Sequence, residues 1–358
     1  MSAQGKKRVW WHTRFGVIGV TTQSYWTGRA GASERPFVAA AGVACRAYSR
    51  PLQRIITDFG ADGAFGRVVE KVREHYGIAV SASAVRAITE RHGAAMQVAP
   101  EVVTPMPAGG VRVLVAETDG SMVPIVEVEA GQGDGRRRRR VKWQEARLCL
   151  AGVAGAATRR YGATMGSVAQ AGAMWRRVAV EAGAGGRTHL HCVGDGASWI
   201  VAQVKEQFGA QASYLVDFYH VSEYLADAAT RIAGAGNRAW LHTQQARLKE
   251  NAVGTVLAEL GQHGEAESVA AEEAVVRRCA QYLANRRAHL DYAGALAAGL
   301  PIGSGEIESG HRTVIQSRLK LSGAWWTIEN AEKMLALRLS RANGEWESYW
   351  QQQRQAQA

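Results

Sequence analysis

The sequence has few cysteines, and they are widely spaced. No two of them form a Cys-x-x-Cys pair, which argues against a dense disulfide framework and against a cysteine-based zinc site. We expect all four to be reduced and buried, as in a cytosolic protein. They are Cys45, Cys149, Cys192 and Cys279.

Long apolar segments are also missing. No uninterrupted apolar run reaches the roughly 18 residues needed to span a bilayer. The first residues are basic but lack the apolar centre of a secretory signal peptide. We therefore expect a chain that is neither exported nor bound to a membrane.

Acidic residues are in deficit. The 358 residues include 43 Lys and Arg against 32 Asp and Glu, which gives a net charge of +11. Such an excess suits a polyanionic partner, most simply nucleic acid, although a merely basic soluble enzyme would share it. The length predicts two or three domains.

Proline is scarce, and three of the seven prolines fall in residues 94–110, which predicts a linker. Before it, residues 1–48 are rich in strand patterns, and their tryptophans suit packing better than base stacking. Residues 49–93 predict short helices joined by a turn at Gly77. This pattern is typical of a helix-turn-helix, whose last helix would present Arg86, Thr89, Glu90 and Arg91 to DNA. A small three-helix bundle would look similar.

After the linker, the pattern changes to strands. Residues 111–118, 122–129 and 141–155 predict three strands, followed by helix, strand, helix and strand up to residue 221. This order predicts an α/β, ribonuclease H-like mixed five-stranded sheet, in which the fourth strand runs parallel to the first. Residues 222–299 read as an all-helical insertion, residues 300–350 as the last part of the core, and 351–358 as a disordered tail.

Two aspartates follow these strands. Asp119 follows the first and Asp195 the fourth, so both should lie at one edge of the sheet. Taken singly, Asp119-Gly120 is a hairpin signal and Asp195 suits an Asx turn. Together, converging carboxylates repel unless a cation lies between them, and oxygen ligands suit Mg²⁺ or Mn²⁺.

A third carboxylate is expected on the helix that starts after Ser304, a candidate N-cap. Glu306 and Glu308 both lie in its first turn, where the helix dipole alone would favour acidic residues. At about 100° per residue, Glu308 lies about 70° from the centre of the apolar face and Glu306 about 130°. The sequence therefore favours Glu308.

Clustered cations complete the expected DNA-binding surface. They are Arg136, Arg137, Arg138, Arg139 and Arg140 in one run, and Arg312, Arg318 and Lys320 after Glu308, with His311 beside them. The cations of the helical insertion fit a solvated surface equally well.

These motifs resemble those of a known family. TDGSMVP around Asp119, WQEARL at 143–148, GDGASWI around Asp195, DFYHVSEYL from Asp217 and PIGSGEIESGHRTVIQSRLK at 301–320 are similar to DDE transposases of bacterial insertion sequences. The resemblance is to the ISKra/ISLre group, distantly Mutator-like, over about residues 110–350. A cysteine-rich stretch of some relatives is absent, so no zinc ribbon is implied.

The resemblance implies Mg²⁺-dependent cleavage of DNA at element ends and joining of the 3′-hydroxyl to target DNA. It places the three metal-binding carboxylates on Asp119, Asp195 and Glu308, with Asp217 and His220 in support. It also implies a homodimer or higher oligomer on double-stranded DNA, in the cytoplasm and nucleoid of a bacterium. The alternatives are a ribonuclease H-like nuclease that does not join, a catalytically inactive transposon-derived DNA-binding protein, and a basic structural protein.

Overall fold

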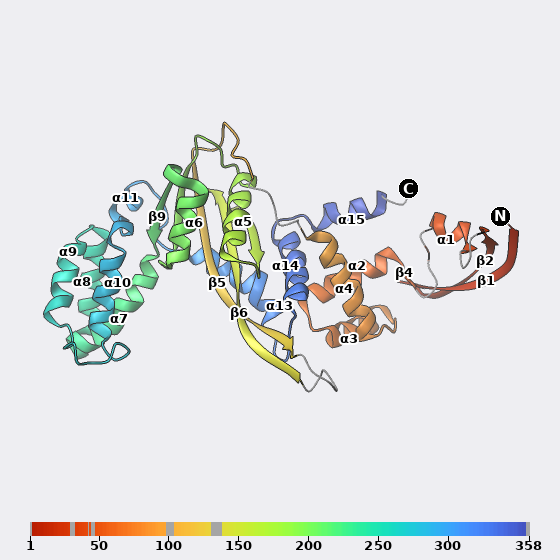
Figure 1. Ribbon diagram of the computed structural model, residues 1–358, viewed down its shortest axis with the longest axis horizontal. Coiled ribbons are helices and arrows are strands. Elements are labelled where there is room, and N and C mark those ends of the chain that lie inside the picture. The colour runs from red at the N-terminus through yellow and green to blue at the C-terminus, as the bar shows by residue number, and fades with distance from the viewer. Residues whose placement is uncertain are drawn as a thin grey trace. The chain divides into compact units, whose positions relative to one another are not determined.

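The computed structural model describes residues 2–28, 33–41, 43, 47–97, 104–129 and 138–355 (Figure 1). The fold is mixed α/β, and the chain divides into two compact units. Unit 1 comprises Met1–Ala99, Val123–Gln144 and Thr313–Ala358, and unit 2 comprises Pro100–Met122 and Glu145–Arg312. Each unit is described by itself.

A five-stranded sheet organises unit 2, as the sequence predicted, and its order is β7-β6-β5-β8-β9. β6 and β7 are antiparallel, whereas β5, β8 and β9 are parallel. The fourth strand of the sheet in chain order therefore runs parallel to the first, as expected. The bounds are β5 Val113–Val128, β6 Arg139–Val153, β7 Arg160–Thr164, β8 His189–Gly194 and β9 Ala212–Val216.

The division into strands differs from the prediction. Asp119-Gly120 forms no hairpin, because β5 continues through it as one strand. Gly120 has no positive φ, and a Cβ there would lie 1.9 Å from Glu145 Oε1. This glycine therefore admits a neighbouring side chain rather than a turn. The short strand β7 was missed, and it supplies the third strand of the meander.

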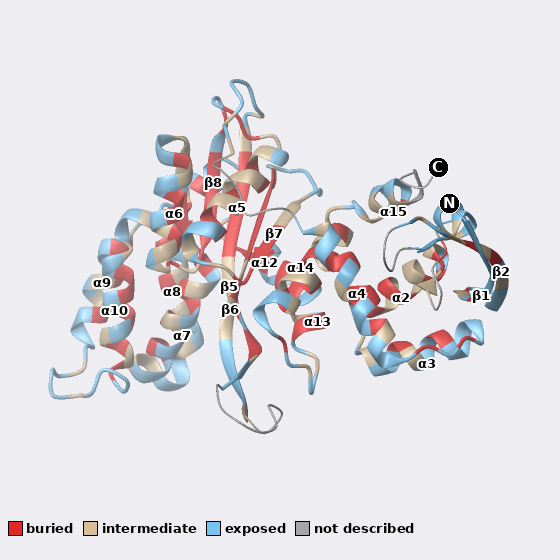
Figure 2. Cartoon of the chain, turned by 45° about the vertical axis from the view of Figure 1, so that its right-hand side comes forward, coloured by how far each residue is buried: buried red, intermediate tan, exposed pale blue. Residues whose placement is uncertain are grey.

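Two amphipathic helices pack on this sheet, α5 (Val168–Glu181) and α6 (Ser198–Phe208) (Figure 1). A capping box formed by Ser167 and Gln170 begins α5. Its Trp175, 1% exposed, packs in one core with residues of β5, β8 and α6. Figure 2 shows that this core buries the first part of β5.

Between β9 and the helix of Glu308, the chain is helical, as expected. Residues 217–304 contain no strand, and all of them are described. The helices are α7 Phe218–Ala233, α8 Asn237–Lys249, α9 Val253–Gln262, α10 Val275–Asn285 and α11 Tyr292–Ala297, with 3-10 turns at Gly234–Gly236 and Arg287–His289.

Unit 1 combines a small sheet with a helical core. Its sheet has the order β3-β2-β1-β4, formed by β1 Ser2–Thr13, β2 Gly16–Trp26, β3 Ser33–Glu34 and β4 Ala47–Tyr48. The Ser81 side chain caps α4 by accepting a hydrogen bond from Ala84 N–H. The helices are α1 Pro36–Ala41, α2 Arg50–Asp62, α3 Phe65–Tyr76, α4 Ala82–Met96, α13 Ser317–Leu319, α14 Ile328–Ala342 and α15 Trp346–Gln355.

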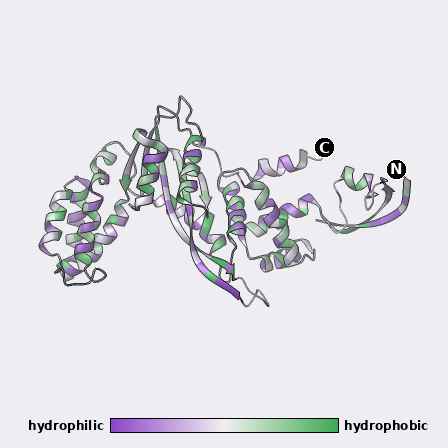
Figure 3. Cartoon of the chain, in the orientation of Figure 1, coloured by the Kyte–Doolittle hydropathy of each residue, from purple (hydrophilic) through white to green (hydrophobic). Residues whose placement is uncertain are grey.

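Apolar side chains are spread over many short elements rather than gathered in one long helix (Figure 3). No helix in the described part of the chain is long and apolar enough to cross a membrane. Cys149, Cys192 and Cys279 are free and buried, as predicted, and Cys45 lies outside the described residues.

Candidate functional site

Asp119 and Asp195 occupy equivalent positions on neighbouring parallel strands of unit 2. The register of β5 and β8 ends with Glu117 opposite Val193. Each aspartate lies two residues further along its strand, and both are half-buried. The parallel pairing of β5 with β8 ends two residues before each aspartate, although β5 itself runs on to Val128, so both aspartates lie at the edge where this pairing ends.

Each aspartate also makes a local hydrogen bond. Asp119 Oδ1 accepts from Gly120 N–H at 2.7 Å. Asp195 Oδ1 accepts from Ala197 N–H at 2.8 Å, so the Asx turn suggested by the sequence is present. Each carboxylate has a second oxygen, and that of Asp195 accepts no hydrogen bond from a described residue.

Helix α12 (Gly305–Gly310) carries Glu308 and is held by Asp217. Ser304 makes no side-chain cap, contrary to expectation. Its N–H donates to Asp217 Oδ2 at 2.6 Å, and its hydroxyl donates to the same oxygen. Asp217 Oδ1 also accepts from Tyr219 N–H at 2.5 Å and from His220 N–H at 3.1 Å, capping α7. The predicted supporting aspartate thus joins the starts of two helices.

Glu117 also holds α12, and sequence reasoning missed it. Its buried carboxyl accepts a 2.8 Å hydrogen bond from Ile307 N–H, one of the donors that a helix leaves unpaired in its first turn. Burial, and to a smaller extent the charges of Glu306 and Asp217, raise the pKa of Glu117 to about 8. The Ile307 hydrogen bond and Arg159 oppose this shift. A carboxyl group within an apolar strand was the signal available in the sequence.

The two glutamates of α12 differ in their partners. Glu306 forms a two-pronged ion pair with Arg159, with 2.7 Å between Nη2 and Oε1. Glu308 is exposed, and its carboxylate binds no described residue. Glu308 is therefore the carboxylate on this helix that is available to a ligand.

His311, which the sequence places among the cations after Glu308, lies beside Asp119. It is 3% exposed, and its Nε2 is 3.3 Å from Asp119 Oδ2. Neither ring nitrogen forms a hydrogen bond within the described structure. His311 opens a π-helical segment, His311–Gln316, a type of irregularity that is frequent at functional sites. A regular helical wheel could not predict it.

The donor chemistry of this edge suits a hard cation, but the predicted three-carboxylate cluster is not assembled. Within the part of the chain that the structure describes, no three His, Cys, Asp or Glu side chains lie close enough to hold a metal ion. Mg²⁺ is commonly bound by one or two carboxylates together with phosphate oxygens of a substrate. Asp119 and Asp195 fit that pattern as a pair.

The helical segment reaches the turn of Asp195 through α10. Tyr282 hydroxyl donates to Asp195 carbonyl oxygen at 2.5 Å, and Arg286 Nε donates to Gly196 carbonyl oxygen at 2.9 Å. His220, the other predicted supporting residue, lies 3.4 Å from Glu223 Oε2 and packs edge-on against Tyr282. These contacts fix the backbone that carries Asp195.

Most of the predicted DNA-binding cations are on the surface. Arg86 and Arg91 are exposed on α4, whereas Thr89 of that helix is fully buried. Arg138 is half-buried, and Arg140 forms an ion pair with Glu129. Arg139, Arg312 and Lys320 are exposed, and Arg136 and Arg137 lie outside the described residues.

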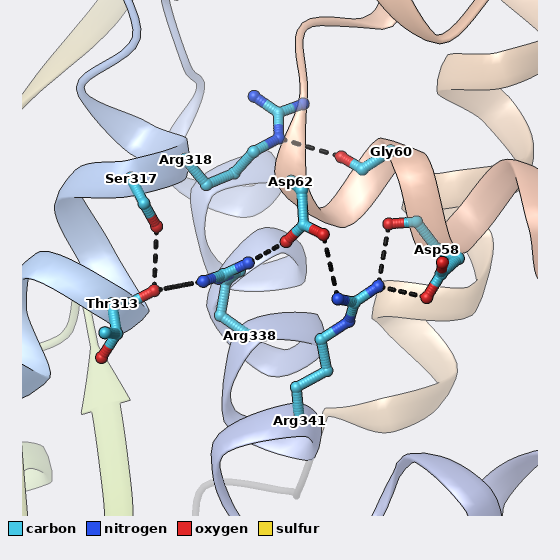
Figure 4. Close-up of polar contacts among 8 residues, drawn as sticks. All are labelled: Asp58, Gly60, Asp62, Thr313, Ser317, Arg318, Arg338 and Arg341. Carbon is cyan, nitrogen blue, oxygen red and sulfur yellow. Dashed lines mark hydrogen bonds and ion pairs between the residues drawn. The ribbon is translucent and has the colours of Figure 1, made fainter. Parts of the chain in front are cut away.

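Arg318 is the exception, because it is 1% exposed within unit 1. Its Nε donates to Gly60 carbonyl oxygen at 2.9 Å (Figure 4). Its guanidinium lies 4.9 Å from the ring centroid of Phe65 and 4.7 Å from that of Trp326. Burial lowers its pKa to about 10. Arg318 is a structural residue, so the expectation that it contacts DNA is wrong.

Comparison with protein families gives one match. Residues 63–354 match the family model described as UPF0236, an uncharacterised protein family. The search of curated proteins finds no match. The matched residues include all of the carboxylates discussed above.

Proposed function

The chain belongs to the uncharacterised protein family UPF0236, and we propose that it is a DDE-type transposase that cleaves and joins DNA with the help of Mg²⁺. The observation that carries the proposal is that Asp119 and Asp195 each lie two residues beyond Glu117 and Val193, the last paired residues of the adjacent parallel strands β5 and β8. Glu308 is the third carboxylate of this proposal, and its helix is held by hydrogen bonds to Glu117 and Asp217 in the same unit.

The strand order supports a ribonuclease H-like core. Numbered within their own sheet, the strands lie in the order 3-2-1-4-5, with an antiparallel meander followed by two parallel strands. The resemblance noted in the sequence implies this arrangement, with the acidic residues at the ends of strands one and four.

We assign roles to the side chains of this edge. Asp119 and Asp195 hold the metal, and Glu308 joins them when DNA is bound. Bound Mg²⁺ supplies Lewis-acid activation of the attacking oxygen and stabilises the leaving oxygen. Glu117 and Asp217 keep the first turn of α12 in place, while His311 lies against Asp119 and fixes its side chain.

The DNA partner is duplex DNA at the element ends and at the target. The proposed contacts are six exposed cations: Arg86 and Arg91 on α4, Arg139 and Arg140 on β6, and Arg312 and Lys320. Such contacts give binding that weakens steeply with salt. We propose that the protein acts as a homodimer or higher oligomer.

A joining assay tests this function. Duplexes carrying the DNA that flanks the gene, with pre-cut ends and a free 3′-hydroxyl, are incubated with the protein, Mg²⁺ and a target plasmid. Wild type should give joined products, and Asp119→Ala and Glu308→Gln should give none. Glu306→Gln is the matched control on the same helix and should still join, at a cost in stability. Cleavage without joining would support the nuclease instead.

A binding measurement separates chemistry from metal affinity. Mn²⁺ titration, followed by electron paramagnetic resonance with and without DNA, should show binding to wild type that Asp119→Ala and Asp195→Ala each weaken at least tenfold. The unassembled carboxylate cluster favours one rival, an inactive transposon-derived DNA-binding protein. That rival predicts DNA binding with no Mn²⁺ binding even on DNA.

A further inference from the structure

The ribbon formed by β1 and β2 (Ser2–Thr13 and Gly16–Trp26) carries charge of one sign only. Residues 2–28 contain four cations and no aspartate or glutamate. The ribbon therefore carries four of the positive charges of the chain without a single compensating carboxylate. The cations are Lys6, Lys7, Arg8 and Arg14, and all four are exposed.

The two faces of this ribbon differ. Directly paired residues of antiparallel strands share a face. On one face lie Lys7 and its partner Thr22, together with Val9, and of these Val9 and Thr22 are buried. The opposite face carries Lys6 with Gln23, Arg8 with Thr21, and Trp10 with Gly19, and none of these six is buried. We call this second face the open face.

The side chain of Arg8 packs against Trp10 and Gly19 on the open face. Its guanidinium lies 4.4 Å from the ring centroid of Trp10, which is 44% exposed. A Cβ at Gly19 would lie 2.6 Å from Arg8 Nε, yet Gly19 has no positive φ that would require glycine. The glycine therefore leaves room for the guanidinium, which lies over an exposed ring without a carboxylate partner among the described residues.

We propose that the open face of this ribbon binds duplex DNA, with Lys6 and Arg8 on phosphates. A two-stranded ribbon fits the major groove, and a guanidinium held over an aromatic ring is restrained before it binds. The choice of DNA as the polyanion rests on the proposed function. The ribbon lies outside residues 63–354, the part that matches the family.

The test is the salt dependence of binding of the full chain to a fluorescent 30-base-pair duplex of random sequence. Each lost phosphate contact lowers the slope of log affinity against log salt by about 0.9. Lys6→Gln with Arg8→Gln should therefore lower the slope by about 1.8. The matched control is Arg187→Gln with Lys205→Gln, two exposed cations of unit 2, and it should keep the wild-type slope.

Gly19→Ala supplies a variant of unchanged charge. The new methyl group would displace the flexible end of Arg8 and would lie 3.0 Å from Cζ3 of the Trp10 ring. Circular dichroism checks that the fold is kept. Affinity for the duplex should fall several-fold at low salt. A wild-type slope in the Lys6/Arg8 double variant would overturn the proposal. The proposal would also be overturned if the ribbon bound a second copy of the chain instead of DNA. In that case sedimentation would show dimers of the wild type that the double variant dissociates, while DNA binding stays unchanged.

These measurements do not depend on catalysis. Failure of Asp119→Ala to abolish joining would refute the proposed chemistry but leave the ribbon slope as it is. Loss of the predicted slope change would refute the ribbon proposal and leave joining untouched.

Discussion

Glu117→Gln is the sharpest perturbation of the candidate site. Glutamine keeps a carbonyl oxygen for Ile307 N–H but carries no titrating proton. In wild type, the pKa of Glu117 is raised from 4.5 to about 8, mainly by burial. The folded state therefore binds more protons than the unfolded state between these two values. Stability is highest below the unfolded pKa and is lost as the pH rises towards the folded pKa.

The size of the effect follows from that window. One unit of pKa shift corresponds to about 1.4 kcal/mol. From pH 6.5 to pH 8, the free energy of unfolding of wild type should fall by about 2 kcal/mol through this group alone. Burial lowers the pKa of His92 to about 4, so His92 titrates below pH 6.5, and the window from pH 6.5 to pH 8 isolates Glu117 among the shifts described.

Chemical labelling of buried thiols measures the unfolding of unit 2. Cys149 and Cys192 are buried in its core, and their modification in increasing urea, located by mass spectrometry, reports unfolding there. Comparing wild type with Glu117→Gln at the same pH cancels the intrinsic pH dependence of the thiols. The variant should gain about 2 kcal/mol over wild type between pH 6.5 and pH 8. A constant difference across that range would refute the assignment of a buried, neutral Glu117.

Three further outcomes are expected. Burial lowers the pKa of His92 to about 4, helped by Arg91 and Arg50. Because folded His92 resists protonation, the free energy of unfolding falls as the pH drops from 6.5 towards 4. His92→Gln should remove this acid-induced loss of stability, as measured in urea titrations. Asp217→Asn removes the negative charge that accepts the two hydrogen bonds from Ser304. The first amides of α12 should then exchange hydrogen at least tenfold faster, and joining should be reduced. Arg318→Met should leave the duplex affinity of the folded protein within twofold of wild type, whereas Arg312→Gln should weaken it.

Much of the sheet was predictable because its strands are apolar and bounded by turn residues. The continuity of β5 through Asp119-Gly120 was not, since the role of Gly120 depends on Glu145 of the neighbouring strand. Short β7 lacked a pattern long enough to recognise. Strand order and pairing follow from tertiary contacts that no local pattern contains.

The candidate site was predicted in part. The parallel placement of Asp119 and Asp195 followed from the order of elements, and the choice of Glu308 over Glu306 stays a prediction that fits the Arg159 ion pair of Glu306. The burial of His311 and Arg318 was missed, because a polar residue on a helix gives no sign of its packing partner. Glu117 was missed because its partner, Ile307 N–H, belongs to the backbone.

The helical segment of residues 218–302 leaves the five-stranded sheet after β9 and returns beside its own starting point. Phe218 N–H donates to Ile302 carbonyl oxygen at 2.8 Å, next to the bonds from Ser304 to Asp217. Hydrogen bonds thus hold the two ends of the helical segment together. Lengthening a chain between fixed ends costs little conformational entropy. The length of the segment between these two anchors can therefore change at little cost, provided that Tyr282 and Arg286 keep their hydrogen bonds to the turn of Asp195.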